Sequence, residues 1–301
     1  MGDQEAYDVV IVGAGPAGLQ AAIHASRKKA SVLVLGKEHK SSLFKAHVEN
    51  MCCLFNATGR TMLETGRRQA ENFGCRFLDE DILKISARDD RFELHTESGS
   101  RMICKALILA TGTARNKLQV KGEKELVGKG VSYCVDCDGN FYRGEEVAVV
   151  GCESAAADGA LTLAEIAGTV HLICADLKVS DTLLEKLENS RVVVHRNAKI
   201  REIAGKAQVH ALILDDGTTL STTGIFIELG AKGLMELATG LGVALDEQMR
   251  FIWTDKGQRT NVPGIFAAGD ICGPPWQVAK AVGEGCVAGL NAVDYARKLK
   301  S

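Results

Sequence analysis

The sequence lacks an excess of charge of either sign, and it lacks any long apolar run. Its 301 residues include 36 Lys and Arg against 38 Asp and Glu, which gives a formal net charge of −2. This balance gives no electrostatic reason to expect nucleic acid or an anionic membrane as a partner. No apolar run approaches the roughly 20 residues that a helix needs to span a bilayer. We therefore expect neither kind of partner.

Features of secretion are also missing. The first residues, MGDQEAYDVVIV, have no basic stretch and no small-residue cleavage site. The ten cysteines are spread along a chain that is 46% hydrophobic and 25% charged, with room for two domains that have real cores. We therefore expect no disulfide scaffold, and we predict that most cysteines are reduced, buried and apolar in role. The predicted location is the cytoplasm.

What the sequence does contain is an internal repeat of strand, glycine turn, helix and strand. Residues 7–36 and 146–176 each hold short valine-rich runs bounded by glycine. Such runs predict buried parallel strands, and the alanine-rich segments between them predict crossover helices. The predicted fold class is therefore α/β, with two Rossmann-like, three-layer domains of the FAD/NAD(P) type.

The second domain is predicted to be inserted in the first. Residues 91–112 alternate around a turn at 97–100 as a hairpin does. An apolar strand at 262–273 and a Gly- and Ala-rich helix at 276–299 follow the second repeat. The joints are predicted near residues 114–118 and 241–245, which gives one domain of residues 1–116 with 244–301 and a second of residues 117–243.

The first glycine turn, GAGPAG at residues 13–18, matches the dinucleotide-binding pattern G-x-G-x-x-G. Gly13 permits the tight turn, Gly15 lets a phosphate approach the backbone, and Gly18 permits close packing of the helix on the strand. The helix N-terminus then offers free N–H groups and a positive dipole end to a pyrophosphate.

The acid that holds a ribose in this pattern is expected about 20 residues further on. The next strand ends in Gly36, and Glu38 is the nearest acid that could replace it. The motif alone therefore leaves NAD and FAD as alternatives.

A C-x-x-C pair stands in SYCVDCDGNF, residues 132–141. Cys134 and Cys137, at a loop or helix start, can close a small disulfide ring, and the helix end stabilises a thiolate that attacks disulfides. Asp138 can carry a proton to the leaving thiolate. A redox role is the favoured interpretation, with a zinc site and a structural disulfide as alternatives.

Zinc needs four ligands, usually from a second C-x-x-C or a histidine pair at similar spacing. Cys52 and Cys53 are adjacent, and His171 and His195 are isolated in the sequence. Adjacent cysteines rarely bridge without strain, although a second redox pair at Cys52 and Cys53 stays an alternative.

The second glycine turn breaks the pattern. In GCESAA, residues 151–156, Glu153 stands where the middle glycine lets the backbone touch a pyrophosphate. Two like charges near 4 Å repel by about 1 kcal/mol in water and by about 4 kcal/mol at a protein-like dielectric constant. This turn therefore predicts poor binding of a dinucleotide pyrophosphate.

Together these segments make the chain resemble the low-molecular-weight thioredoxin reductases over nearly its whole length. The resemblance implies that the first unit binds FAD, that thioredoxin is the substrate and that the protein is a homodimer. The segments that carry it are GAGPAG (13–18), ATG (110–112), GKGVSYCVDCDG (128–139), VAVVG (147–151) and VPGIFAAGD (262–270).

The resemblance also implies residue roles. Cys137 would contact the flavin, Cys134 would attack the partner disulfide, and Asp138 would be the acid/base. Asp270 would bind the ribityl chain, the backbone N–H groups of Gln277 and Val278 would face the flavin ring with Asn50 nearby, and Thr111 and Gly112 would line the adenine side. The residues implied at FAD are Gly13, Gly15, Pro16, Ala17, Gly18, Gly36, Lys37, Asn50, Thr111, Gly112, Gly269, Asp270, Trp276, Gln277 and Val278.

Two residues near this site, one aromatic and one cysteine, have roles that the sequence leaves open. Trp276 is either a wall of the flavin site or a packed core aromatic, and Cys272 is a candidate for approaching the flavin region.

In the family the second unit reads G-G-G-N-[ST]-A and then H-R-R, for the pyrophosphate and 2′-phosphate of NADPH. Here residues 151–156 read GCESAA and residues 174–176 read CAD, so both determinants are absent. The chain also resembles the ferredoxin-linked branch of the family, most strongly at GDICGPPWQVAKAVGEG, residues 269–285. This implies that reduced ferredoxin supplies electrons to FAD, with NADH or a deazaflavin as alternative donors.

An acidic ferredoxin would need a basic face, and residues 27–29, 37–45 and Arg67–Arg68 are candidates, with ordinary solvated faces as the alternative. Two other functions compete with the reductase. One is a flavin dithiol oxidase that uses oxygen, which Asp138 disfavours. The other is a flavin redox sensor without turnover.

Overall fold

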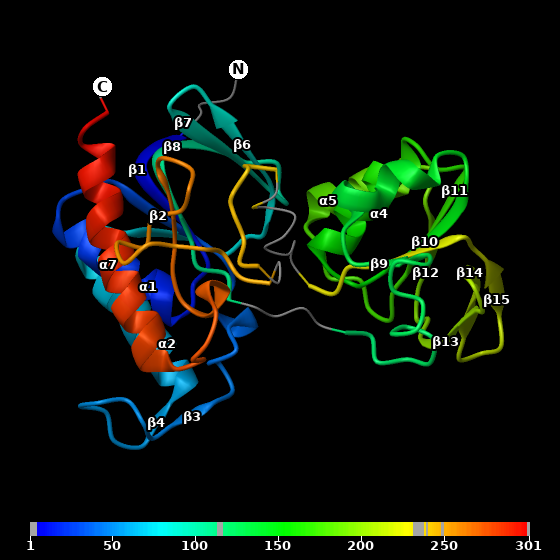
Figure 1. The fold of residues 1–301 in the computed structure, drawn as a ribbon, viewed down its shortest axis with the longest axis horizontal. Helices are drawn as coiled ribbons and strands as arrows, with labels where there is room; N and C mark the ends of the chain where they lie inside the picture. Colours follow the sequence, from blue (N-terminus) through cyan, green and yellow to red (C-terminus); the bar gives the residue numbers. More distant parts are fainter. Residues whose placement is uncertain (1–4, 113–116, 231–237, 239, 248–249, 300–301) are drawn as a thin grey trace. The chain divides into compact units, whose positions relative to one another are not determined.

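The computed structural model describes residues 5–112, 117–230, 238, 240–247 and 250–299 (Figure 1). The chain divides into two compact units, of which the first comprises Met1–Thr96, Ser100–Ala114 and Leu237–Ser301, and the second comprises Glu97–Gly99 and Arg115–Glu236. The joint expected near residues 114–118 falls partly on residues outside the described ranges.

The first unit is built on a seven-stranded sheet. Its strands are β1 (Glu5–Val12), β2 (Val32–Leu35), β5 (Arg76–Leu78), β6 (Ile82–Arg88), β7 (Arg91–Thr96), β8 (Arg101–Leu109) and β17 (Ile265–Ala267). The order is β5-β2-β1-β8-β7-β6, with β17 paired to β8. The pairs on the β5-to-β8 side and the β17–β8 pair are parallel, and β6, β7 and β8 are antiparallel neighbours. The predicted hairpin is the β7–β8 pair.

Helices and a hairpin complete this unit. They are α1 (Pro16–Arg27), η1 (Glu38–Lys40), β3 (His47–Val48), β4 (Ala57–Thr58), α2 (Gly59–Asn72), η3 (Asp270–Cys272) and α7 (Val278–Ala296). Helices α1 and α7 lie side by side (Figure 1) because small residues face each other: a Cβ on Gly285 would lie 2.1 Å from the carbonyl oxygen of Ala17. Fully buried valines and alanines from β1, α1 and α7 form the core beneath them.

The second unit has a five-stranded parallel sheet and a separate three-stranded meander. The sheet, in the order β12-β11-β10-β16-β9, and the meander β13-β14-β15 consist of β9 (Val131–Ser132), β10 (Glu146–Val150), β11 (Thr169–Ile173), β12 (Val193–His195), β13 (Ile200–Gly205), β14 (Val209–Leu214), β15 (Thr219–Ser221) and β16 (Gly224–Ile227). Its helices are α3 (Val135–Asp138), η2 (Gly139–Tyr142), α4 (Ser154–Ala164) and α5 (Asp181–Glu188). The predicted α/β class with two Rossmann-like units is confirmed.

Both glycine turns lie at the carboxyl ends of central parallel strands, β1 in the first unit and β10 in the second. In open α/β sheets, ligands bind at this edge. The two turns and the strand ends beside them are therefore the places to look for a site. None of the described helices is both long enough and apolar enough to cross a bilayer.

Candidate functional site

The first glycine turn begins α1 with donors that are available to a ligand. Gly15 is the N-cap in extended backbone, and Pro16 occupies the start of the helix. Within the described residues, the backbone N–H groups of Ala17 and Gly18 have no hydrogen-bond partner, while that of Leu19 donates to the carbonyl of Gly15 at 2.9 Å. Free first-turn donors at the positive end of a helix are a ready site for an anion such as a pyrophosphate.

Other strand ends converge on this turn. Gly13 has φ of +119°, and a Cβ there would lie 2.3 Å from the carbonyl oxygen of Ala110 and 3.0 Å from the N of Thr111. A Cβ on Gly36 would lie 3.4 Å from the Cα of Gly13. The ends of β1, β2 and β8 therefore meet around Gly13, and only glycine allows so close an approach.

The end of β17 reaches the same helix, since a Cβ on Gly269 would lie 2.9 Å from the Cβ of Ala17. Two residues that sequence reasoning missed brace this turn. The N–H of Gly269 donates to the Glu284 Oε2 at 2.8 Å, and the Lys280 Nζ donates to the carbonyl of Gly269 at 2.8 Å. Burial raises the pKa of Asp270, which Lys280 counteracts. The i,i+4 spacing of Lys280 and Glu284 was the available signal.

The residues before α7 agree with the predictions only in part. The Asn50 Nδ2 donates to the Gln277 Oε1 at 2.8 Å, so two residues predicted at the flavin ring do lie together. However, the backbone N–H of Gln277 donates to the carbonyl of Pro275 at 2.9 Å and is therefore not available. Trp276 is 61% exposed, so the alternative of a packed core aromatic is wrong.

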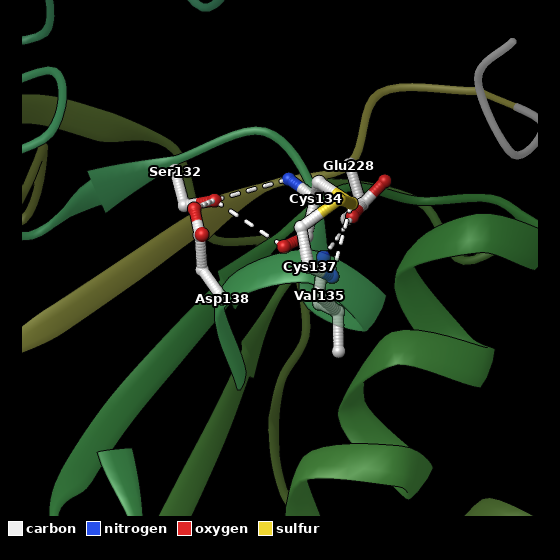
Figure 2. Close-up of a disulfide and its surroundings, with 6 residues drawn as sticks. All are labelled: Ser132, Cys134, Val135, Cys137, Asp138 and Glu228. Atoms are coloured by element: carbon white, nitrogen blue, oxygen red, sulfur yellow. Dashed lines mark hydrogen bonds between the residues drawn. A yellow bond between two sulfur atoms is a disulfide. The ribbon is translucent and has the colours of Figure 1, made fainter. Parts of the chain in front are cut away.

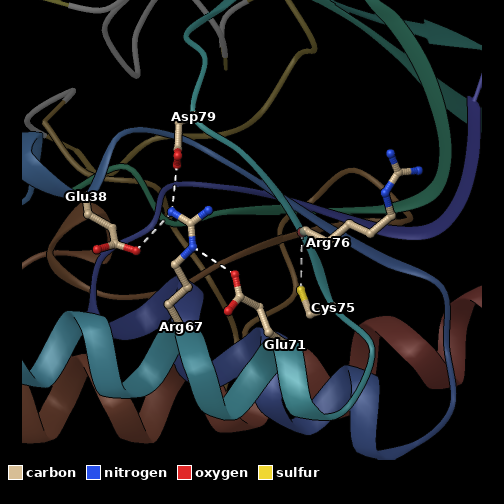
Figure 3. A network of polar contacts seen from close by, with 6 residues as sticks. All are labelled: Glu38, Arg67, Glu71, Cys75, Arg76 and Asp79. Atoms are coloured by element: carbon tan, nitrogen blue, oxygen red, sulfur yellow. Dashed lines mark hydrogen bonds and ion pairs between the residues drawn. The ribbon is translucent and has the colours of Figure 1, made fainter.

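The segment after Gly36 is tied to other parts of its own unit. The Lys37 Nζ donates to the buried carboxylate of Asp81 at 3.2 Å. Glu38, the candidate for a ribose-binding acid, pairs with Arg67 at 3.2 Å, and Figure 3 shows that Arg67 also reaches Glu71 and Asp79. The carboxylate of Glu38 is therefore held by a guanidinium group.

The C-x-x-C pair forms a disulfide in the second unit. The Sγ atoms of Cys134 and Cys137 are 2.02 Å apart, and Cys134 is the N-cap of α3. The Cys134 Sγ accepts the backbone N–H of Cys137 at 3.1 Å (Figure 2). Cys134 is buried and Cys137 is exposed. A helix start with a sulfur as its cap is the arrangement that stabilises a thiolate.

Asp138 is held beside this disulfide by a serine that sequence reasoning missed. The Ser132 Oγ donates to the Asp138 Oδ2 at 2.6 Å and accepts the N–H of Cys134 at 3.1 Å (Figure 2). Ser132 is buried. Asp138 can therefore exchange a proton through a fixed hydroxyl group next to the cysteine pair.

Glu228 is a second carboxylate that sequence reasoning missed. It directly follows β16 and is only 5% exposed, and its Oε1 accepts the N–H of Val135 at 3.2 Å (Figure 2). Its signal in the sequence is an acid directly after the fully apolar end of a strand, Ile225–Ile227.

In the second glycine turn, a backbone N–H of the first helical turn is bound by the protein's own backbone. Glu153 is the N-cap of α4, and the N–H of Ala155 in the first helical turn donates to the carbonyl of Gly230 at 3.3 Å. The carbonyl of Cys152 accepts the N–H of Lys178 at 2.7 Å. A donor that would meet a pyrophosphate is thus already occupied.

The acidic residue near this turn does not replace the contact that the bound donor would have made. The side chain of Asp176, at the position of an NAD-type ribose acid, is 77% exposed and pairs with Lys178 at 3.3 Å.

The prediction that most cysteines are buried is wrong, and two histidines that are distant in the sequence lie together. Only three of the eight free cysteines are buried, because Cys52 and Cys53 lie exposed between β3 and β4 and the other three are half-buried. His171 and His195 are not isolated: neighbouring parallel strands β11 and β12 bring the His171 Nδ1 to 3.0 Å from the His195 Nε2. Among the described residues, no group of three or more His, Cys, Asp or Glu is arranged to hold a metal ion. Burial raises the pKa of Cys272 to about 12.

The comparisons with known proteins agree with this geometry. A family model described as pyridine nucleotide-disulphide oxidoreductase matches residues 7–285. The chain is 32% identical to the thioredoxin reductase of Listeria monocytogenes serovar 1/2a over 310 aligned residues, covering 99% of this chain and 96% of that protein.

Two solved structures are similar over the whole chain. One is the atypical thioredoxin reductase TRi of Desulfovibrio vulgaris Hildenborough, with a TM-score of 0.85, 36% identity and coverage of 98% of this chain and 99% of that one. The other is a ferredoxin-flavin thioredoxin reductase of Clostridium acetobutylicum, with a TM-score of 0.72, 30% identity and coverage of 99% and 100%. The chain therefore belongs to the pyridine nucleotide-disulphide oxidoreductase family, as a flavoprotein disulfide oxidoreductase of the thioredoxin reductase type whose cofactor is FAD.

Proposed function

We propose that this protein is a thioredoxin-disulfide reductase that does not use NADPH and receives its electrons from reduced ferredoxin. The observation that carries the proposal is the second turn, where Glu153 occupies the N-cap position of α4 and the N–H of Ala155 donates to the carbonyl of Gly230. Residues 174–176 also provide no cationic side chain for a 2′-phosphate. The ferredoxin-flavin thioredoxin reductase among the similar structures supports the choice of donor.

In this proposal the two units divide the work. The first turn would hold the FAD pyrophosphate on the N–H groups of Ala17 and Gly18, and the residues at the ends of β2, β8 and β17 would line the rest of the cofactor. FAD supplies the step from a one-electron donor to a two-electron acceptor. The other predicted contacts, from Lys37, Asn50, Thr111, Gly112, Asp270 and Val278, belong to the same proposal.

The second unit carries the disulfide exchange. Cys137 would exchange electrons with the flavin, and Cys134 would attack the disulfide of oxidised thioredoxin. Asp138, held by Ser132, gives a proton to the leaving thiolate of the substrate. This fixed carboxylate also favours a reductase over a flavin dithiol oxidase.

Fewer cations are available to bind ferredoxin than the three basic segments of the sequence contain. Lys28 pairs with Asp294, Lys37 and Lys40 pair with Asp81, and Arg67 is surrounded by three carboxylates. The remaining exposed cations of the three basic segments are Arg27, Lys29, Lys45 and Arg68. These four residues are the ones to test for an effect on ferredoxin-dependent rates.

The test is anaerobic reduction of the FAD-loaded protein, followed by the flavin absorbance. NADPH, NADH, a reduced deazaflavin and enzymatically reduced ferredoxin are offered separately, and oxidised thioredoxin is then added. We expect rapid bleaching with ferredoxin alone and stoichiometric formation of reduced thioredoxin. Rapid bleaching with NADPH contradicts the proposal, and bleaching without turnover of thioredoxin indicates a sensor.

A Cys137→Ser variant is the matched control for this experiment. It should still be bleached by ferredoxin, because the first unit is unchanged, but it should not reduce thioredoxin.

A further inference from the structure

Glu228 is a buried carboxylate that lies next to the redox disulfide. Glutamate is almost never fully buried in proteins unless it is paired, and here the side chain is 5% exposed. Its Oε1 accepts the N–H of Val135, the residue that follows Cys134 and begins α3. The carboxylate therefore contacts the first residue of the helix that carries the disulfide.

Two neighbouring glycines leave room for the Glu228 side chain to pack close to α3. A Cβ on Gly151 would lie 2.0 Å from the carbonyl oxygen of Glu228, and a Cβ on Gly159 would lie 3.9 Å from its Cγ and 3.0 Å from the Val135 Cγ2. Two glycines of the second turn and of α4 thus allow the end of β16 and its side chain to come close to α3.

The first turn of α3 is shared between two acceptors. The N–H of Val135 goes to Glu228, and the N–H of Cys137 goes to the Cys134 Sγ, at 3.2 and 3.1 Å. Both acceptors therefore lie at the same short turn of backbone. A thiolate at Cys134 and the carboxylate of Glu228 would be like charges at this turn, and they would repel each other.

We propose that Glu228 is a positioning residue that makes the Cys134–Cys137 couple more reducing by placing a negative charge at the first turn of α3. Reduction breaks the S–S bond and adds two electrons. With one proton taken up, one sulfur leaves as a thiol and the other stays a thiolate, and with a second proton both are thiols. A nearby negative charge destabilises the thiolate form and so lowers the reduction potential, since stabilisation of the reduced form is what makes a dithiol couple oxidising.

This role is separate from that of Asp138. Asp138 approaches the disulfide through Ser132, from the other side of Cys134 in Figure 2, and is placed to move a proton. Glu228 comes from a different strand and acts on the equilibrium between disulfide and dithiol. The inference rests on the disulfide oxidoreductase chemistry of the family and is independent of which donor reduces FAD.

The test is the reduction potential of the Cys134–Cys137 couple in the full-length, FAD-loaded protein. The protein is equilibrated at pH 7 in buffers of oxidised and reduced dithiothreitol, trapped by alkylation, and the peptide with both cysteines is quantified by mass spectrometry. Glu228→Gln keeps the shape and an acceptor oxygen but removes the charge. We expect an equilibrium constant about tenfold more favourable to the dithiol, which corresponds to a potential about 30 mV more positive.

Two further variants make the result specific. Glu228→Asp keeps the charge and should stay close to the potential of the parent protein. Glu165→Gln removes the same charge from an exposed residue at the end of α4 and should leave the potential unchanged. The proposal is overturned if Glu228→Gln has the potential of the parent, or if Glu228→Asp or Glu165→Gln shifts it as far as Glu228→Gln does.

Discussion

The turn after β1 and the turn after β10 share the order of strand, glycine and helix, but they end in different hydrogen-bond patterns. In the first, Gly15 caps α1 and the N–H groups of Ala17 and Gly18 have no partner within the described residues. In the second, Glu153 occupies the same position and the N–H of Ala155 is bound by Gly230. A phosphate that the first turn can bind would meet a carboxylate and an occupied donor at the second.

This difference shows that the scaffold and the ligand site are specified by different residues. The buried valines of β1 and β10 and the alanines of α1 and α4 give both units the same architecture. The two turns differ at the N-cap residue and at the first-turn N–H of Ala155, which the carbonyl of Gly230 binds. Fold alone therefore does not assign a nucleotide to the second unit.

The largest effect is expected when the first turn is made like the second. Gly15→Glu copies Glu153, and a Cβ at Gly15 would lie 3.4 Å from the Ser41 Oγ, so the turn itself can persist. One added charge beside a phosphate costs about 4 kcal/mol at a protein-like dielectric constant, roughly a thousandfold in affinity for FAD. The measurement is the FAD dissociation constant from flavin fluorescence.

Gly15→Ala is the control for this substitution, because it adds the Cβ without the charge and should lose much less affinity. If Gly15→Glu were purified with a full complement of FAD, the contrast between the two turns would not depend on this position.

A smaller effect is expected for a substitution on α3. It tests whether the second unit supports thioredoxin reduction through α3 and not through its glycine turn. Asp138→Asn should lower the rate of thioredoxin reduction by about 10²-fold, the lower end of the range for loss of a general acid or base. The measurement is turnover with oxidised thioredoxin under the donor that bleaches the flavin.

Asp136→Asn is the matched control, because Asp136 lies on the same short helix and its side chain is exposed. Equal losses in the two variants would mean that the charge of the helix, and not the placed proton of Asp138, supports the rate.

The reverse substitution, which makes the second turn like the first, is expected to change the affinity for NADPH only slightly. Glu153→Gly removes the carboxylate, but Ala155 still donates to Gly230 and residues 174–176 still provide no cation. We therefore expect the affinity for NADPH to rise by less than about tenfold, that is by less than about 1.4 kcal/mol. Titration calorimetry of both proteins with NADPH measures it, and tight binding by the variant would show that Glu153 alone had closed the site.

The smallest effect concerns pH and the second unit. Burial lowers the pKa of His195, and the charge of His171 lowers it further. The folded protein therefore binds this proton less readily than the unfolded chain does, whose histidine pKa is about 6.5. The stabilisation is present above that pH and is lost as the pH falls through the folded-state value.

Urea unfolding at pH 7.5 and at pH 5.5 measures this difference in the free energy of unfolding. His195→Gln should lose less stability on acidification than the parent protein, whereas the exposed His39→Gln should behave like the parent. A His195→Gln variant that loses as much as the parent would exclude this histidine as a cause.

The sequence by itself determined the local motifs of this protein. Valine runs bounded by glycine identify β1 and β10, the pattern G-x-G-x-x-G identifies the start of α1, and the spacing of Cys134 and Cys137 identifies the disulfide. Each of these depends on residues within a few positions of one another, where backbone geometry and hydrophobic periodicity act directly. The resemblance to a known family added two predictions, that the cofactor is FAD and that the enzyme is of the thioredoxin reductase type.

The tertiary structure decided what lies beside these motifs. The bond from Ala155 to Gly230 spans 75 residues, and the one from Val135 to Glu228 spans 93, and neither has a local pattern in the sequence. The pairing of His171 with His195 likewise arises because parallel strands bring distant residues into register. These contacts depend on how the sheet orders its strands, so only the folded chain shows that a donor of the second turn is already bound and that a buried carboxylate lies at the redox helix.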